Sequence, residues 1–164
     1  MVGKIRKAIN SIVLLIQPLT MGYLSTLVSD YLTSTKNSFQ SSEVYLKLKS
    51  LYSFTPQPYL FGIVWPILFI LMGLAIWRIY RKYENREHRK DSLILNQVQI
   101  FLSFLWSPLY LYNVSYAFAL ILFLNVSVWI LLYFYYKTDK TSFILMLPYT
   151  FWLLFATLLN YLSI

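Results

Sequence analysis

Charged residues in this chain are few and lie in short clusters, so the stretches between the clusters are long and uncharged. Only 12% of the 164 residues are charged, against about 25% in a typical soluble domain. The uncharged stretches contain 22, 28, 45 and 24 residues and cover positions 8–29, 50–77, 92–136 and 141–164. A transmembrane helix needs about 20 apolar residues, and the third stretch has room for two. The spacing of charges therefore predicts five membrane-spanning helices.

The longest uncharged stretch is expected to break near Ser107-Pro108 and Asn113, because proline lacks a backbone donor and asparagine tolerates turn conformations. The five helices are then predicted near residues 8–32, 58–81, 92–111, 114–136 and 141–163. Almost everything else is connecting chain. The predicted fold class for residues 1–164 is therefore one all-α domain, a bundle of five transmembrane helices.

The basic residues predict the orientation of the bundle in the membrane. Eleven of the fourteen fall in the N-terminal tail and in the second and fourth connections, and only Lys36, Lys47 and Lys49 fall in the first connection. Lys and Arg concentrate in cytoplasmic loops, so the N-terminus is predicted to be cytoplasmic and the C-terminus to lie outside. This asymmetry explains the net charge of +8. We expect the lipid bilayer as a partner and no nucleic acid.

The first connection, residues 33–57, is the only long one. Loops of more than about 12 residues in compact domains are usually functional or disordered. Two interpretations are open from the sequence: a short interfacial helix that covers the outer mouth of the bundle, or a solvated linker.

Residue types that usually carry catalysis or bind metals are scarce. The chain has no cysteine, and its lone histidine, His88, lies in a charged connection. No predicted span has an acid or a base in its interior, since Asp30 lies at the end of the first. We therefore expect no metal site, no catalytic residue of the usual kinds and no ion-coupled pump.

Aromatic residues gather on one face of two predicted helices, within sectors of about 80° at 100° per residue. Trp65 and Trp106 would lie about 8–10 Å from the outer ends of their helices, and Trp152 about 18 Å. The three tryptophans either line one cavity beneath the first connection or simply pack together. The residues that share a face are Phe61, Trp65 and Phe69 on the second helix, and Tyr149, Trp152, Ala156 and Asn160 on the fifth.

Small residues on the third helix suggest a contact between chains. In membranes, small side chains let helices approach closely. Ser103 and Ser107, four residues apart, are therefore a candidate dimer face.

Three stretches of the sequence resemble motifs of one family. Residues 56–77, PQPYLFGIVWPILFILMGLAIW, resemble the second helix of the TspO/translocator protein family, the tryptophan-rich sensory proteins. Trp106-Ser107-Pro108-Leu109 resembles its third-helix motif. The resemblance to its fifth helix is carried by Leu147-Pro148-Tyr149, Trp152, Phe155-Ala156 and Leu159-Asn160.

This resemblance implies a homodimeric five-helix protein of the bacterial cell membrane that needs no cofactor and binds protoporphyrin IX, haem or another flat apolar molecule. Animal members bind cholesterol and benzodiazepine-like drugs, and some bacterial members promote light-dependent porphyrin breakdown. The expected function is a tetrapyrrole sensor, carrier or regulator of porphyrin levels. The alternatives are a light-dependent porphyrin-degrading enzyme with Trp152 as electron donor, and a non-catalytic assembly partner in the membrane.

The resemblance also implies a binding site. Family tryptophans that match Trp65 and Trp152 face the ligand, and a proline before the second helix matches Pro56. Together with the aromatic faces, this gives the expected ligand-binding residues: Trp65, Trp152, Pro56, Phe61, Tyr149, Trp106, Ala156 and Tyr45.

The sequence departs from the family pattern at three places. An asparagine that is usual in the third helix is Ser103 here, a Trp-Tyr pair of the first loop is reduced to Tyr45, and the basic end of the animal cholesterol motif is missing after Tyr161. Cholesterol is therefore not expected as a ligand. Because no buried His or Cys is available for axial ligation, a metal-free porphyrin is expected to bind at least as well as haem.

Overall fold

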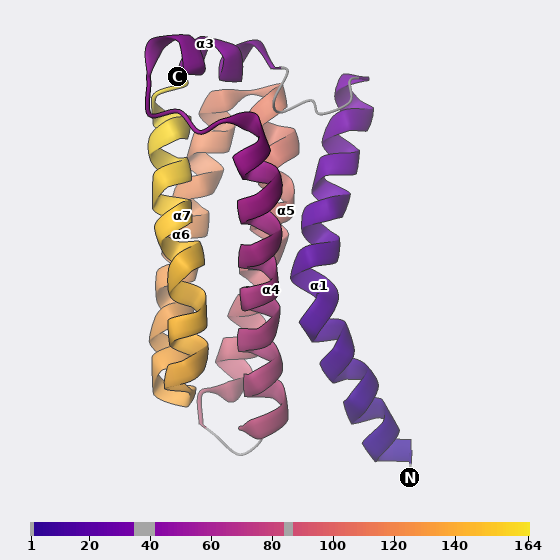
Figure 1. Cartoon of the computed structure of the whole chain (residues 1–164). Coiled ribbons are helices and arrows are strands. Elements are labelled where there is room, and N and C mark those ends of the chain that lie inside the picture. Colours follow the sequence, from indigo (N-terminus) through magenta and orange to yellow (C-terminus); the bar gives the residue numbers. More distant parts are fainter. Residues whose placement is uncertain (1, 35–41, 84–86) are drawn as a thin grey trace.

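The computed structural model describes residues 2–34, 42–83 and 87–164, and this part of the chain is almost entirely helical, with no β-strand. Five of its helices are long and apolar enough to cross a membrane, and a sixth is short. The predicted fold class is therefore confirmed (Figure 1). The long helices are α1 (Val2–Thr33), α4 (Pro58–Lys82), α5 (Arg89–Tyr112), α6 (Val114–Thr138) and α7 (Lys140–Tyr161), and the short one is α3 (Glu43–Leu51).

The five long helices pack in a closed ring. Helix α1 packs against α4 and α5, α7 lies between α4 and α6, and α6 packs against α5. Figure 1 shows the N-terminus at one end of the bundle and the C-terminus at the other, where α3 also lies. Met72, Ile76, Val128 and Met146 of the core have no exposed surface. The odd number of spans thus places the two termini at opposite ends.

Four predicted spans agree with the observed helices to within three residues at each end, but α1 begins at Val2 instead of near residue 8. An uncharged stretch marks what can lie inside the bilayer, not where a helix begins. Lys4, Arg6 and Lys7 have good helix propensity, and they extend the helix beyond the apolar segment.

Helices α5 and α6 form a tight hairpin with only Asn113 between them. The Asn113 side-chain oxygen accepts hydrogen bonds from the backbone N–H groups of Ser115 (3.0 Å) and Tyr116 (3.1 Å), which caps α6. The prediction that Pro108 helps to break the helix here is wrong, because α5 continues through Pro108 to Tyr112. Membrane helices tolerate an internal proline where a neighbouring helix satisfies the carbonyl that it frees.

The first connection contains helix α3, which lies across the end of the bundle (Figure 1). Ser42 caps its first turn by accepting a hydrogen bond from the backbone N–H of Tyr45 at 3.2 Å. Tyr45 and Leu48 are buried. Of the two interpretations of this connection, the short helix is the one observed, while residues 35–41 of the predicted loop lie outside the described residues.

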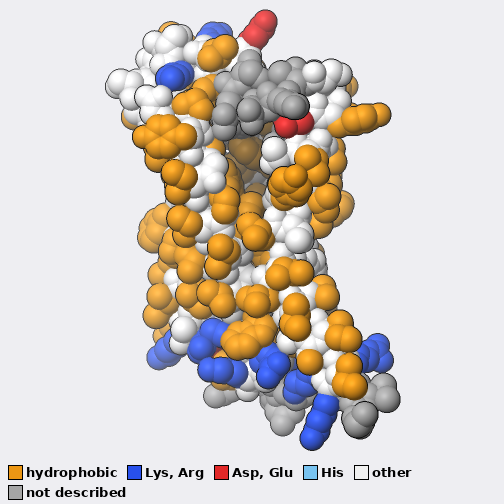
Figure 2. All heavy atoms as spheres, turned by 45° about the vertical axis from the view of Figure 1, so that its right-hand side comes forward, with side chains coloured by type: hydrophobic (Ala, Val, Ile, Leu, Met, Phe, Trp, Pro, Cys, Tyr) orange, Lys and Arg blue, Asp and Glu red, His pale blue; other side chains and the backbone are white. Residues whose placement is uncertain are grey.

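The surface is that of an integral membrane protein. Figure 2 shows hydrophobic side chains over the middle of the bundle, and Lys and Arg side chains gathered at the end that holds the start of α1. Large apolar side chains such as Ile16, Ile67, Phe101, Phe123 and Phe151 are exposed on all five long helices. Such an apolar surface is stable in contact with lipid and not in contact with water. The cytoplasmic placement of the basic end stays a prediction.

Helix α1 is held against α4 by two glycines. A Cβ atom at Gly73 would lie 2.0 Å from the backbone oxygen of Leu15, and one at Gly22 would lie 2.1 Å from the Phe69 ring. Backbone thus meets backbone at Gly73, the close approach that small residues permit between membrane helices. By contrast, a Cβ at Gly62 would meet nothing within 4 Å.

An ion pair closes the basic end between α4 and α7. Arg78 Nε donates to Asp139 Oδ2 at 2.9 Å, and the hydroxyls of Tyr83 (3.0 Å) and Ser142 (2.7 Å) donate to the same carboxylate. Asp139 also caps α7 by accepting from the backbone N–H groups of Thr141 and Ser142. Burial alone raises the pKa of Asp139, but the hydrogen bonds outweigh burial and lower the pKa to about 2.

We expect the substitution Gly73→Ala to lower the free energy of unfolding by about 1–3 kcal/mol, because the added methyl group forces the backbones of α1 and α4 apart. Thermal unfolding in detergent measures the effect. Gly62→Ala is the matched control and should be neutral or slightly stabilising, since alanine is the better helix former and the site is open. Equal melting temperatures of the two variants would contradict the close contact.

We expect the ion pair at Asp139 to stabilise the bundle above about pH 4 and to be lost as the pH falls toward 2. The pKa in the folded chain is about 2 against an ordinary value of 3.8, so the carboxylate stabilises the fold only where it is ionised. Asp139→Asn keeps a capping side chain but removes the charge. It should cost about 2 kcal/mol at pH 7, and its difference from the native chain should vanish near pH 2. A difference that does not change with pH would refute this assignment.

Candidate ligand-binding cavity

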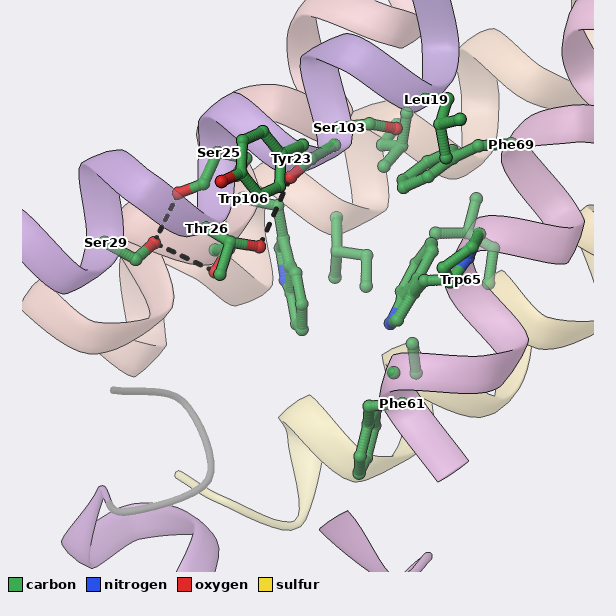
Figure 3. Close-up of a pocket in the computed structure, with 18 of the residues that line it drawn as sticks. Leu19, Tyr23, Ser25, Thr26, Ser29, Phe61, Trp65, Phe69, Ser103 and Trp106 are labelled. Atoms are coloured by element: carbon green, nitrogen blue, oxygen red, sulfur yellow. Dashed lines mark hydrogen bonds between the residues drawn. The ribbon is translucent and has the colours of Figure 1, made fainter. Parts of the chain in front are cut away.

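A cavity of about 350 Å³ lies in the half of the bundle nearer α3, between α1, α4 and α5, with α6 and α7 behind it (Figure 3). Its mouth reaches the surface at Tyr23, Thr26 and Gly62, which are exposed. Figure 2 shows the surface hollowed in this half of the molecule. The lining residues are Leu19, Gly22, Tyr23, Ser25, Thr26, Ser29 and Asp30 of α1; Phe61, Gly62, Trp65, Pro66 and Phe69 of α4; Ser103, Trp106 and Ser107 of α5; Ile121 and Leu124 of α6; and Leu153 and Ala156 of α7.

The aromatic side of the cavity is formed by α4, and one further ring faces it from α5. Phe61, Trp65 and Phe69 follow one another at four-residue intervals on α4, and Trp106 of α5 stands across the space from Trp65 (Figure 3). The rings of Trp65 and Phe69 stack, with centroids 5.5 Å apart and planes 27° from parallel. Four-residue spacing places side chains on one helix face, which is why α4 presents them together.

Trp106 is fixed by two hydrogen bonds that together join three helices. Its Nε1 donates to Asn160 Oδ1 at 3.0 Å, and Asn160 Nδ2 donates to the backbone oxygen of Val114 at 3.2 Å. Asn160 is 1% exposed. The orientation of the indole is therefore set by α7 and α6 as well as by its own helix.

The opposite side of the cavity carries hydroxyl groups from α1 and α5 (Figure 3). Ser25 Oγ donates to the backbone oxygen of Phe104 at 2.7 Å, and Ser29 Oγ lies 3.0 Å from Ser107 Oγ. Phe104 is the residue four before Pro108, whose missing N–H leaves that carbonyl without its helical donor. Ser25 of α1 supplies the donor instead. The proline predicted to break the helix thus provides an anchor for the neighbouring helix.

Tyr149 and Trp152 lie behind the aromatic side, not on it. The Trp152 ring meets Trp65 edge-on at 6.4 Å and Phe61 at 6.1 Å, and Tyr149 meets Trp65 at 6.4 Å. The Tyr149 hydroxyl lies 2.7 Å from Ser103 Oγ. Trp152 Nε1 is buried and has no hydrogen-bond partner in the described part of the chain. These two residues support Trp65, and a ligand in the cavity meets Trp65 first.

Tyr45 of α3 ties the first connection to the bundle. Its hydroxyl donates to the backbone oxygen of Pro56 at 2.8 Å, and its ring meets Phe61 edge-on at 6.1 Å. Burial raises the pKa of the Tyr45 hydroxyl above its ordinary value of 10.0, so the group stays a neutral donor at physiological pH. Tyr45 and Pro56 thus hold the chain that leads into α4 and do not line the cavity.

The structure therefore divides the eight predicted binding residues into two groups. Trp65, Trp106, Phe61 and Ala156 line the cavity. The other four either pack against Trp65 or hold the chain that leads from α3 into α4: Trp152, Tyr149, Tyr45 and Pro56. Among the described residues, no group of three His, Cys, Asp or Glu side chains could hold a metal ion. Stacking, apolar contact and hydrogen bonding are the interactions that this cavity offers.

Sequence reasoning missed the contribution of α1. Small and hydroxyl residues recur on this helix at intervals of three and four residues, a spacing that places them on one helix face and could have indicated that α1 lines the cavity. These residues are Gly22, Ser25, Thr26 and Ser29. It also misplaced two serines of α5. Ser103 and Ser107 line the cavity and bond to Tyr149 and Ser29, so the prediction that they form a dimer face is wrong.

Comparison with known proteins gives a consistent result. A profile described as the TspO/MBR family matches residues 14–163. The chain is similar to the tryptophan-rich protein TspO of Archaeoglobus fulgidus, with 33% identity over 110 residues that cover 66% of this chain and 70% of the relative. It is also similar to the tryptophan-rich protein TspO of Chlorobaculum tepidum, with 28% identity over 66% of this chain and 70% of the relative. Protein CrtK of Rhodobacter capsulatus is 27% identical over 66% of this chain and 69% of its own length.

Proposed function

Because this chain belongs to the TspO/MBR family, we propose that it is a membrane-embedded tetrapyrrole-binding protein that acts as a sensor, carrier or regulator of porphyrin levels. The proposal includes a homodimer in the bacterial cell membrane with the N-terminus in the cytoplasm. The ligand is protoporphyrin IX, haem or a flat apolar molecule of that kind, and the protein needs no cofactor to bind it.

The observation that carries this proposal is the aromatic side of the cavity. Trp65 and Trp106 face each other across the space, and Phe61 and Phe69 extend the surface on either side of Trp65 (Figure 3). Offset stacking of aromatic rings is favourable beyond the burial of area alone. A flat macrocycle is the ligand shape that gains most from two indoles on opposing walls.

The size and openness of the cavity also support a large flat ligand. Its volume of about 350 Å³ falls in the range of small-molecule pockets, about 300–1,000 Å³. A macrocycle larger than this volume can keep one edge outside, because the mouth opens at Tyr23, Thr26 and Gly62. That edge would then lie between α1 and α4 in the lipid.

A titration with protoporphyrin IX, followed by the porphyrin's own absorbance and fluorescence, tests the proposal on purified protein in detergent. We expect Trp65→Leu to weaken binding by about tenfold, because the stacking surface is lost. Trp152→Leu should have a smaller effect, since Trp152 lies behind Trp65. Trp129→Leu is the matched control and should bind normally, because Trp129 is 54% exposed on the outer surface of α6.

Melting temperatures of the three variants show whether each bundle is intact. Equal binding by the Trp65 and Trp129 variants would place the ligand elsewhere. A native chain that binds no tetrapyrrole would refute the proposal and favour the assembly-partner alternative.

One observation favours light-dependent porphyrin breakdown as a second candidate function. Trp65 lines the cavity, and the Trp152 ring lies edge-on behind it at 6.4 Å, so the two indoles form a path from the cavity into the bundle. In this function the photo-excited porphyrin takes an electron from Trp152 through Trp65 and passes it to dioxygen, which becomes superoxide. The oxidised Trp152 then recovers an electron from the porphyrin ring, and the oxidised ring combines with superoxide and opens.

Illumination of the protein–porphyrin complex tests this second function. We expect porphyrin absorbance to fall faster than in protein-free detergent, and the gain in rate to be lost in Trp152→Phe while binding is kept. Porphyrin loss at the protein-free rate would exclude the enzymatic function and leave the binding function intact.

A further inference from the structure

The turn between α6 and α7, at the basic end of the bundle, carries two lysines and one acid (Figure 1). Lys137 belongs to the last turn of α6, Lys140 begins α7, and Asp139 alone lies between the two helices. Asp139 is 7% exposed, and Arg78 of α4 donates to its two carboxylate oxygens at 2.9 and 3.4 Å. Both lysines are exposed. The fold thus turns the acid inward and leaves two positive charges on the surface.

The charges of these two lysines are not neutralised by the protein. Among the described residues, neither lysine forms an ion pair with an acid. Instead, Lys137 Nζ lies 5.6 Å from the centroid of the Tyr133 ring. Lys140 Nζ lies 5.7 Å from the centroid of the Tyr136 ring. An aromatic face attracts a cation without cancelling its charge, so both ammonium groups are held in place and can still bind an anion.

The two lysine–tyrosine pairs lie at the end of an exposed apolar strip on α6. Tyr133 and Tyr136 are three residues apart, which places them on one helix face, and they are 54% and 50% exposed. Trp129, which is also exposed, lies eight residues before Lys137 and therefore about 12 Å along the helix. Toward the middle of the bundle, α6 exposes Leu122, Phe123, Val126, Trp129 and Ile130.

This order of side chains matches the layers of a phospholipid. Tyrosine rings favour the headgroup level of a bilayer, and lysine stems lie along apolar surface while their ammonium groups reach toward the phosphates. Anionic lipids attract lysines that lie close to the membrane surface. The apolar strip below the tyrosines is complementary to an acyl chain. A soluble anion would use the two charges but not the strip, whereas a lipid with a negatively charged headgroup uses both.

We propose that Lys137 and Lys140 bind the headgroup of an anionic phospholipid whose acyl chain lies along α6 as far as Trp129. None of these three residues lines the cavity, so the site is separate from that of the proposed function. A lipid bound here ties the turn between α6 and α7 to the membrane surface.

Brominated lipids, which quench tryptophan fluorescence on contact, test this site. The full-length protein is placed in vesicles of phosphatidylcholine and phosphatidylglycerol, and one lipid at a time is brominated in the middle of its acyl chains. The Trp129 signal is the difference between the native chain and Trp129→Phe. Its quenching gives the binding of phosphatidylglycerol relative to phosphatidylcholine. At low salt we expect a ratio of about ten or more, since each lysine near the surface contributes about fivefold.

Removal of both charges should abolish this preference. We expect Lys137→Gln with Lys140→Gln to bring the ratio close to one, and Lys137→Arg with Lys140→Arg to keep it. The matched control is Lys4→Gln with Lys82→Gln, which removes two exposed charges from the same end of the bundle but from α1 and α4. It should change the ratio by less than about twofold, because distant charges are screened. Melting temperatures show whether each variant is folded.

Each other outcome would overturn the site. A ratio of one in the native chain would show that the lysines do not select the headgroup. An equal fall in the control variant would assign the preference to the charge of the whole basic end. Absence of Trp129 quenching by either lipid would show that something other than lipid, such as a second copy of the chain, covers this face of α6. None of these results bears on porphyrin binding in the cavity.

Discussion

The cavity depends on how α1 is held against the rest of the bundle. At Gly73 the backbone of α4 meets the backbone of α1 at Leu15, with no space for even a methyl group. Nearer the α3 end, Gly22 of α1 faces the Phe69 ring, while Gly62 of α4 faces open space. The two helices are therefore joined near their middle and leave room between them toward α3. That room is where the cavity lies.

Hydrogen bonds within the membrane also hold α1 against α5. The bilayer core offers no partner for a backbone polar group, so backbone groups there must be satisfied within the protein. Pro108 leaves the carbonyl of Phe104 without its helical donor, and Ser25 supplies one from α1. Ser29 and Ser107 add a second link between α1 and α5. The residues that make these bonds also line the cavity, so the bonds that hold α1 in place shape its hydroxyl side.

The fold could be predicted from the sequence, because only long uncharged stretches can cross the bilayer and the spacing of the charged residues shows where these stretches lie. Helical periodicity also predicted that Phe61, Trp65 and Phe69 share one face of their helix, and that face lines the cavity. The direction of a side chain does not determine which of several side chains lies nearest the cavity. Trp152 lies in the same sector of α7 as Ala156, yet Trp65 comes between it and the cavity.

The hydroxyl side was not predictable for a different reason. Small and hydroxyl residues in a membrane helix are expected at any close helix contact. The pairing of Ser25 with the carbonyl that Pro108 frees joins positions 79 residues apart, and no local pattern records it. The same limitation explains why Ser103 and Ser107 were assigned to a dimer face although they point into the bundle.

The two sides of the cavity are therefore anchored independently. The aromatic rings are fixed inside the bundle by the bond from Trp106 to Asn160 and by the packing of Trp65 on Tyr149. The hydroxyl side is fixed by the bonds between α1 and α5. The motifs that carry the family resemblance lie on α4, α5 and α7, and none lies on α1. Substitutions on α1 can therefore alter the hydroxyl side of the cavity while the aromatic rings of α4 and α5 stay in place.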